Sequence, residues 1–86
     1  MKYTVVVFSS RNDSMTFYNL IKRYIGFCSI INTPRSVSRA CGISIKISGA
    51  YINTAIKIIS SHKFSTFIGI YEIDIVNGRE IPNKIY

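Results

Sequence analysis

Residues 2–9, KYTVVVFS, form the stretch that decides the fold of this 86-residue chain. The run consists almost entirely of β-branched and aromatic side chains, which are typical of strands. Because the apolar residues follow one another without alternation, we expect a central strand that is buried on both faces. The polar residues 9–13 follow directly and supply N-cap candidates, so the sequence predicts a helix immediately after this strand.

Apolar side chains then recur at helical spacing as far as Gly26, which we expect to end the helix. This apolar stripe consists of Phe17, Leu20, Ile21, Tyr24 and Ile25. Residues 27–31 predict a second strand. Residues 43–48 alternate strictly, which predicts a third strand with one buried face and one solvated face that carries Ser44 and Lys46.

A second helix is predicted from the cap Ser48 to about residue 62. Its apolar stripe is Ile52, Ala55, Ile56 and Ile59. Residues 64–76 predict a long strand with a bulge at Gly69, and residues 77–78, Asn-Gly, are a strong hairpin signal. Residues 79–86 then return as a short edge strand, since Pro82 cannot sit at the centre of a sheet.

The predicted order is β-α-β-β-α-β followed by one hairpin strand. Right-handed crossovers then give an α+β, ferredoxin-like βαββαβ sandwich, in which two helices cover one face of an antiparallel sheet. We expect one domain over residues 1–76, with residues 77–86 as a C-terminal hairpin strand.

The chain carries 11 Lys and Arg against 4 Asp and Glu, a formal net charge of +7. Such a balance points to nucleic acid, an anionic membrane surface or an acidic protein as partner classes, but the basic residues form no continuous run. No apolar stretch is long enough to span a bilayer, and the chain leads straight into the strand over residues 2–9 and not into a long apolar stretch with a cleavage site, as a secretion signal would. We therefore expect a cytoplasmic protein without membrane contact.

The two cysteines, Cys28 and Cys41, lie thirteen residues apart. In a reducing cytoplasm we expect no structural disulfide between them. Together with the single His62 they match no zinc signature, and the chain contains neither a Gly-rich phosphate loop nor a pair of carboxylates placed for acid–base chemistry. No metal or other cofactor is predicted.

Residues 32–44, NTPRSVSRACGIS, form the loop in which function is expected. The predicted topology brings this loop to the end of the sheet where the first helix begins, beside Ser10 and Arg11 and near the junction at His62 and Lys63. Cations and a helix N-terminus favour the thiolate form of a cysteine, so Cys41 is the candidate reactive group. The alternatives are that Cys41 is a small packing residue, as we expect for Cys28, and that His62 only caps its helix.

Several of these segments together resemble a known family. They are residues 8–10, Phe-Ser-Ser, residues 34–42, PRSVSRACG, the strand over 43–47, and residues 71–73, Tyr-Glu-Ile. The chain is similar over about residues 2–73 to the small proteins called Putative Se/S carrier protein-like. This resemblance implies that the cysteine before the glycine, Cys41, holds sulfur or selenium as a persulfide or selenosulfide. Arg39 and Ala40 fill positions that are often small or polar in the family, which adds charge near the thiol.

On this basis the favoured function is that of a carrier or co-substrate, and not of a stand-alone enzyme. It would receive the chalcogen from a donor such as a cysteine desulfurase and pass it to an acceptor protein. We expect Cys41 to react, and the bound anion or the partner to be held by a further set of residues: Arg35, Arg39, Ser38, Gly42, Ser10 and Arg11.

Two other functions compete with the carrier. A nucleic-acid-binding module fits the fold and the charge, but it needs exposed aromatic side chains on the central strands. Here the aromatics are Tyr3, Phe8 and Tyr71, while Ser44 and Lys46 occupy the third strand and no RNP-like string is present, so nucleic acid is the less favoured partner. A regulatory oligomerising module is the third function, and a homodimer is compatible with the carrier as well.

Overall fold

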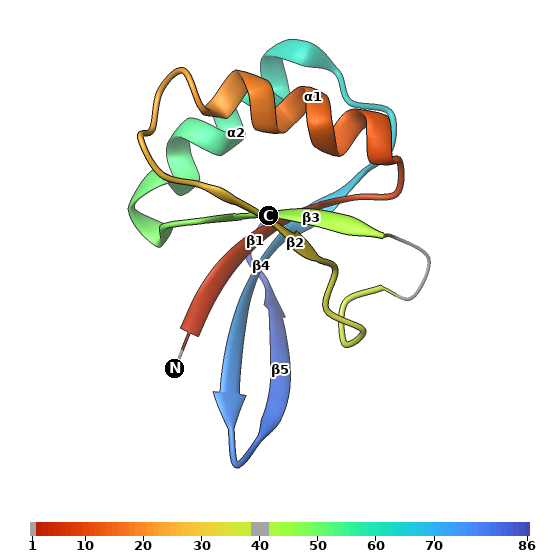
Figure 1. Cartoon of the computed structure of the whole chain (residues 1–86), viewed down its shortest axis with the longest axis vertical. Coiled ribbons are helices and arrows are strands. Elements are labelled where there is room, and N and C mark those ends of the chain that lie inside the picture. Colours follow the sequence, from red (N-terminus) through yellow and green to blue (C-terminus); the bar gives the residue numbers. More distant parts are fainter. Residues whose placement is uncertain (1, 39–41) are drawn as a thin grey trace.

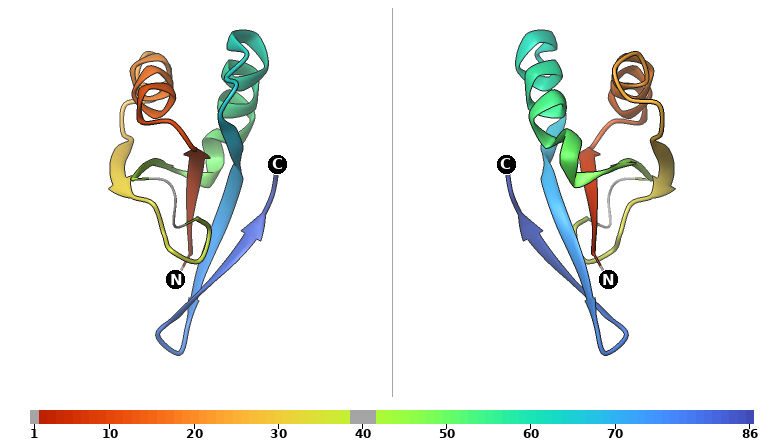
Figure 2. Two further views of the ribbon diagram at one scale, coloured as in Figure 1. Left: turned by 90° about the vertical axis from the view of Figure 1, so that its right-hand side faces the viewer. Right: turned by 90° about the vertical axis from the view of Figure 1, so that its left-hand side faces the viewer.

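The computed structural model describes residues 2–38 and 42–86, which form one antiparallel sheet with two helices on one face (Figures 1 and 2). The helices are α1 (Arg11–Ile21) and α2 (Ile52–His62), the latter preceded by the 3-10 turn η1 (Gly49–Tyr51). The strands are β1 (Lys2–Phe8), β2 (Ser29–Asn32), β3 (Ile43–Ile47), β4 (Phe67–Val76) and β5 (Arg79–Lys84).

The strand order is β2-β3-β1-β4-β5, and every neighbouring pair is antiparallel. The predicted α+β class is therefore confirmed. β1 lies between β3 and β4, so it is a central strand, and Val5, Val6 and Val7 are completely buried as residues 2–9 predicted. The register between β1 and β4 shifts between Val7 and Phe8, next to Gly69, where the sequence predicted a bulge.

The core between the sheet and the helices is built around aromatic rings and isoleucines. Phe8, which is 1% exposed, contacts Phe17 of α1, with 5.4 Å between ring centroids. Its ring also lies 5.0 Å from that of Phe64 and 5.6 Å from that of Phe67. This cluster fixes the middle of α1 and the start of β4 to the end of β1.

The opposite face of the sheet, here called the outer face, is not an open solvated surface. Val5, Val7 and Ile73 are buried there, with Tyr3, Ile31, Val37, Ile68 and Tyr71 packed against them. Ser44 is also completely buried. The prediction that Ser44 faces solvent is therefore wrong: the chain that leaves β2 folds back over this face and covers it.

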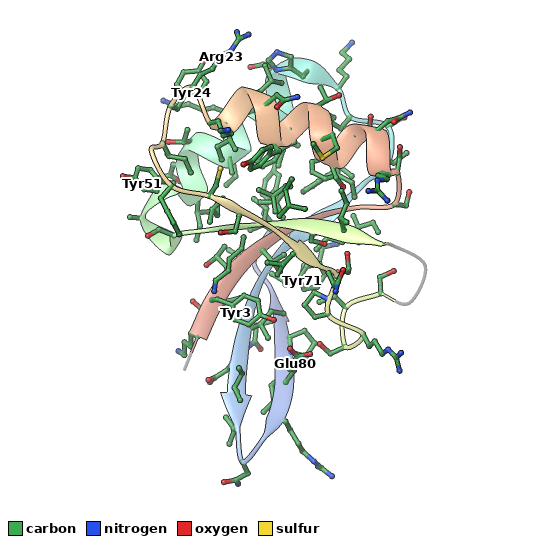
Figure 3. The ribbon with its side chains drawn as sticks, viewed as in Figure 1. Tyr3, Arg23, Tyr24, Tyr51, Tyr71 and Glu80 are labelled. Atoms are coloured by element: carbon green, nitrogen blue, oxygen red, sulfur yellow. The ribbon has the colours of Figure 1, made fainter. Side chains whose placement is uncertain are left out.

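α1 is shorter than its apolar pattern predicted. It ends at Ile21, and a tighter turn follows, in which the N–H of Arg23 donates to the carbonyl of Leu20. This turn directs Tyr24 to the outside, where 68% of it is exposed, while Ile25 returns to the core (Figure 3). The second strand also begins later than predicted, at Ser29, which leaves Phe27 81% exposed.

α2 ends at His62 as predicted, and Ser48 caps η1 by accepting a hydrogen bond from the N–H of Ala50 at 3.3 Å. The buried residues of α2 are Ala55, Ile58 and Ile59. Ile58 was missing from the predicted stripe, whereas Ile52 and Ile56 are only partly buried.

β4 and β5 form the long hairpin that projects from the sheet, away from the helices (Figure 2). Asn77 and Gly78 both have positive φ, at 53° and 76°, which is the turn that an Asn-Gly pair favours. Pro82 lies on the edge strand β5, as predicted. Within the described part of the chain, neither helix has the length and hydropathy needed to cross a bilayer.

Candidate functional site

The described stems of the loop after β2 lie side by side at one end of the sheet (Figure 1). β2 and β3 are paired up to Asn32 and Ile43, and the N–H of Thr33 donates to the carbonyl of Gly42 at 3.3 Å. The predicted site residues Arg39 and Cys41 lie outside the described residues. The described residues next to them in the chain, Ser38 before Arg39 and Gly42 after Cys41, therefore mark where the site lies.

A pair of buried hydroxyl groups fixes the first stem to the sheet. Thr33 Oγ1 lies 2.6 Å from Ser44 Oγ, and the two residues are 8% and 0% exposed. The buried Pro34 then begins a turn in which the N–H groups of Val37 and Ser38 donate to its carbonyl. Val37 packs against the apolar cluster of the outer face. The stem is therefore anchored to the sheet and does not simply extend into solvent.

The second stem is connected to the first turn of α1. The hydroxyl of Ser14, a completely buried residue, donates to the carbonyl of Ile43 at 3.3 Å and to the carbonyl of Ser10 at 3.2 Å. The prediction that this loop and the beginning of α1 share one end of the sheet is therefore confirmed for the described stems.

The beginning of α1 is capped by groups of the protein itself. Ser10 Oγ accepts a hydrogen bond from the N–H of Asp13 at 3.4 Å. The Asp13 carboxylate lies in the first turn and accepts two hydrogen bonds from Thr66, one from its N–H and one from its hydroxyl. A carboxylate in this place already offsets the positive end of the helix dipole. Ser10 acts as the N-cap, and its predicted contact with an anion is not part of this geometry.

The basic residues predicted for the site are accessible. Arg35 in the turn and Arg11 at the first position of α1 are both exposed, as is Gly42, and Ser38 is partly buried. Lys63, which follows α2, is exposed as well and adopts a left-handed conformation with φ of 46° that ends the helix. The described rim of this end therefore carries cations directed to solvent.

His62 does not face the loop. Its Nδ1 lies 3.1 Å from the carbonyl of Ile58, one turn back in α2. This contact satisfies one of the carbonyls left free at a helix C-terminus. The interpretation of His62 as a helix cap is confirmed, and we assign it no chemical role.

Cys28 lies directly before β2, at the other end of the strand from the loop, and not inside the strand as predicted. It packs against the core under the helices. Burial raises the pKa of the Cys28 thiol above its ordinary value, and the nearby charge of Lys22 lowers it only in part. The thiol is thus protonated at neutral pH, which fits the packing role that the sequence predicted.

The outer face offers little room for stacking bases. Phe8 is buried on the side of the helices, so only Tyr3 and Tyr71 of the three predicted aromatics belong to this face. Tyr3 donates a hydrogen bond from its hydroxyl to Glu80 Oε2 at 3.1 Å (Figure 3). Burial, together with this hydrogen bond, raises the pKa of Tyr3. A carboxylate on this face would repel the phosphates of a nucleic acid.

We expect the buried hydroxyl pair to show a non-additive effect on stability. Thr33→Val leaves the Ser44 hydroxyl buried without its partner and should lower the free energy of unfolding by about 1–3 kcal/mol. Thr33→Val combined with Ser44→Ala removes both polar groups, so the double variant should lose less than the sum of the single variants. Urea denaturation of the four proteins gives the coupling energy. Strict additivity would mean that the two hydroxyls do not depend on each other.

A comparison with protein families bears on the identity of the chain. The sequence profile of the family described as Putative Se/S carrier protein-like matches residues 2–72. The chain belongs to this family. The match includes both stems of the loop and ends within β4, so β5 lies beyond it. No curated protein and no solved structure matches the chain.

Sequence reasoning did not identify Thr33, Ser44 and Ser14 as supports of the site. One feature of the sequence could have indicated them. Ser44 on its strand and Ser14 on the inward side of its helix are small polar residues at positions where apolar side chains are expected. Among the residues that the structure describes, no group of three or more His, Cys, Asp or Glu side chains could hold a metal ion.

Proposed function

We propose that this chain is a sulfur or selenium carrier in which Cys41 holds the transferred atom as a persulfide or selenosulfide. The observation that carries the proposal is the family match over residues 2–72, which contains the whole segment 34–42, PRSVSRACG. The anchored stems support it, since they hold the two ends of this segment on the sheet. We further infer that the sheet and helices follow the ferredoxin-like arrangement and that the protein works in the cytoplasm.

The transfer needs one thiolate and no metal. The sulfur of Cys41 attacks the outer sulfur of a persulfide on the donor enzyme, and a new S–S bond forms on Cys41. The S–S bond of the donor breaks, and the donor cysteine leaves as a thiolate, so electrons balance without an oxidant. In the next step an acceptor attacks the outer sulfur on Cys41 and releases the Cys41 thiolate.

Basic residues have two roles in this scheme: they favour the charged forms of the sulfur, and they contact the partner protein. Arg35 and Arg39 favour the thiolate and the anionic persulfide by charge, and Gly42 gives a partner close access to the backbone beside the sulfur. Arg11 and Ser38 border the same end of the sheet and contact the partner. Residues 1–66 contain nine Lys and Arg but only one acidic residue, so the donor and acceptor are expected to present acidic surfaces.

The test is a loading reaction with the complete wild-type chain, a cysteine desulfurase and free cysteine. Intact-mass measurement should show the addition of about 32 Da, which a thiol reductant removes. The control omits free cysteine and should show no addition. Failure of the wild-type chain to gain sulfur from a desulfurase that remains active would contradict the function as a sulfur carrier.

A further inference from the structure

A groove of about 280 Å³ lies between α2 and the turn that follows α1. Tyr24 of this turn forms one side of the groove. The other side is a stripe of α2 residues that recur at helical spacing and therefore share one side of the helix: Thr54, Lys57, Ile58, Ser61 and His62. None of these residues belongs to the loop of Cys41 or to its stems.

The backbone holds Tyr24 in an exposed position. Its N–H donates to the carbonyl of Ile21 at 2.9 Å, and the next residue, Ile25, is only 3% exposed and anchors the turn in the core. The Tyr24 side chain itself is 68% exposed, and Figure 3 shows it beside Arg23 at the outer edge of the turn. Tyrosine and arginine are common anchors of protein–protein interfaces, and a fixed backbone lowers the entropy that is lost on binding.

The positive charges beside the groove have no acidic partner within the chain. The four acidic residues of the chain are Asp13, Glu72, Asp74 and Glu80. Asp13 lies at the opposite end of α1, and the other three lie on the strands β4 and β5. Arg23 and Lys57 are both exposed, and neither forms an ion pair with any residue that the structure describes. The groove is therefore bordered by uncompensated positive charge, which is complementary to a carboxylate-bearing partner.

The size and the lining of the groove suit a single apolar side chain. Its volume is just below the roughly 300–1,000 Å³ of sites that enclose a whole small molecule. Ile58, which is 5% exposed, contributes apolar surface between the polar side chains of α2. An apolar side chain bound here would also remove part of the Tyr24 ring from water, which is favourable in proportion to the area covered.

We infer that this groove docks an acidic segment of a partner protein. One apolar side chain of the segment contacts Tyr24 and Ile58, and carboxylates on either side of it pair with Arg23 and Lys57. A nucleic acid fits less well, because single strands bind through a series of stacked bases and phosphate contacts, and the groove offers one ring and two cations. The inference does not rest on the proposed function, because the groove includes no residue of the Cys41 loop.

Titration of the complete, ¹⁵N-labelled chain with the peptide acetyl-Glu-Glu-Leu-Glu-Glu-amide tests the inference. We expect saturable changes in the amide shifts of Tyr24, Lys57 and Ser61, with a Kd of about 1 mM for so short a segment. A peptide with Gln in place of every Glu lacks the charge, and one with Gly in place of Leu lacks the apolar side chain. Each should bind at least roughly fivefold more weakly. Pentauridylate, a single-stranded RNA, should leave these amides unchanged.

Two variants of exposed residues locate the site, and both should keep the wild-type amide spectrum outside the groove. Tyr24→Ser should weaken binding of the Leu peptide roughly tenfold, and Lys57→Met roughly fivefold. Lys46→Met is the matched control, because it removes the same charge from β3, where Lys46 Nζ lies 5.2 Å from the centre of the Tyr3 ring, and it should leave the Kd unchanged. The inference would be overturned by no saturable change in the wild-type chain, by equal weakening in Lys57→Met and Lys46→Met, or by pentauridylate binding at these amides as tightly as the peptide.

Discussion

Replacing Phe8 with alanine should lower the free energy of unfolding by about 3–5 kcal/mol, the cost of deleting a large side chain from a packed core. Phe8 is 1% exposed and contacts the rings of Phe17, Phe64 and Phe67, so its removal leaves a cavity that these neighbours cannot close without moving. A domain of this size has a total stability of roughly 4–13 kcal/mol. The variant should therefore be partly unfolded at room temperature or have a much lower denaturation midpoint.

Phe27→Ala is the matched control for this prediction. The same aromatic ring is removed, but from a position that is 81% exposed, so stability should change by no more than about 0.5 kcal/mol. Urea denaturation followed by circular dichroism measures both variants. If Phe8→Ala and Phe27→Ala lost equal stability, the core described between the sheet and the helices would be wrong.

Cys41→Ser should abolish sulfur loading completely, whereas Cys28→Ser should retain it. A serine hydroxyl cannot replace the thiolate as an acceptor of sulfane sulfur, so no residual reaction is expected at position 41. Cys28 packs against the core and has a raised pKa, both of which keep it in the unreactive thiol form. Intact-mass measurement after reaction with a desulfurase and free cysteine separates the two variants.

Both cysteine variants should keep the wild-type circular dichroism spectrum, which shows that any loss of loading is chemical. Loading of Cys41→Ser to the wild-type extent would contradict the role of Cys41. Loss of loading in Cys28→Ser, with Cys41 intact and the fold preserved, would transfer the function to Cys28.

Much of the fold could be predicted because its elements carry strong patterns. The apolar run of β1, the helical spacing of α1 and α2 and the Asn77-Gly78 turn each depend on local chemistry that the tertiary structure does not override. The errors arose where distant segments decide burial. Ser44 alternates like a solvated strand residue, yet the turn beginning at Pro34 covers it, and no local pattern contains this contact.

The site was predictable in a different way. Cys41 and the arginines stand out by residue type, and the order of the elements brings their loop to the end of the sheet where α1 begins. The support of that loop was not predictable, because Thr33, Ser44 and Ser14 act through hydrogen bonds between residues 11 and 29 positions apart. The contact of the Asp13 carboxylate with Thr66 was likewise hidden, since Thr66 lies in the other half of the chain, whereas the N-cap Ser10 belongs to the cap residues 9–13 that the sequence predicted.

The central claim is that sulfur resides on Cys41, and peptide mapping of the loaded wild-type chain tests it most directly. Cleavage after Arg and Lys separates the two cysteines, with Cys28 in the peptide 24–35 and Cys41 in the peptide 40–46. After alkylation, the additional mass of about 32 Da should be found on peptide 40–46 and be absent from peptide 24–35. Sulfur on peptide 24–35, or divided equally between the two peptides, would contradict the claim.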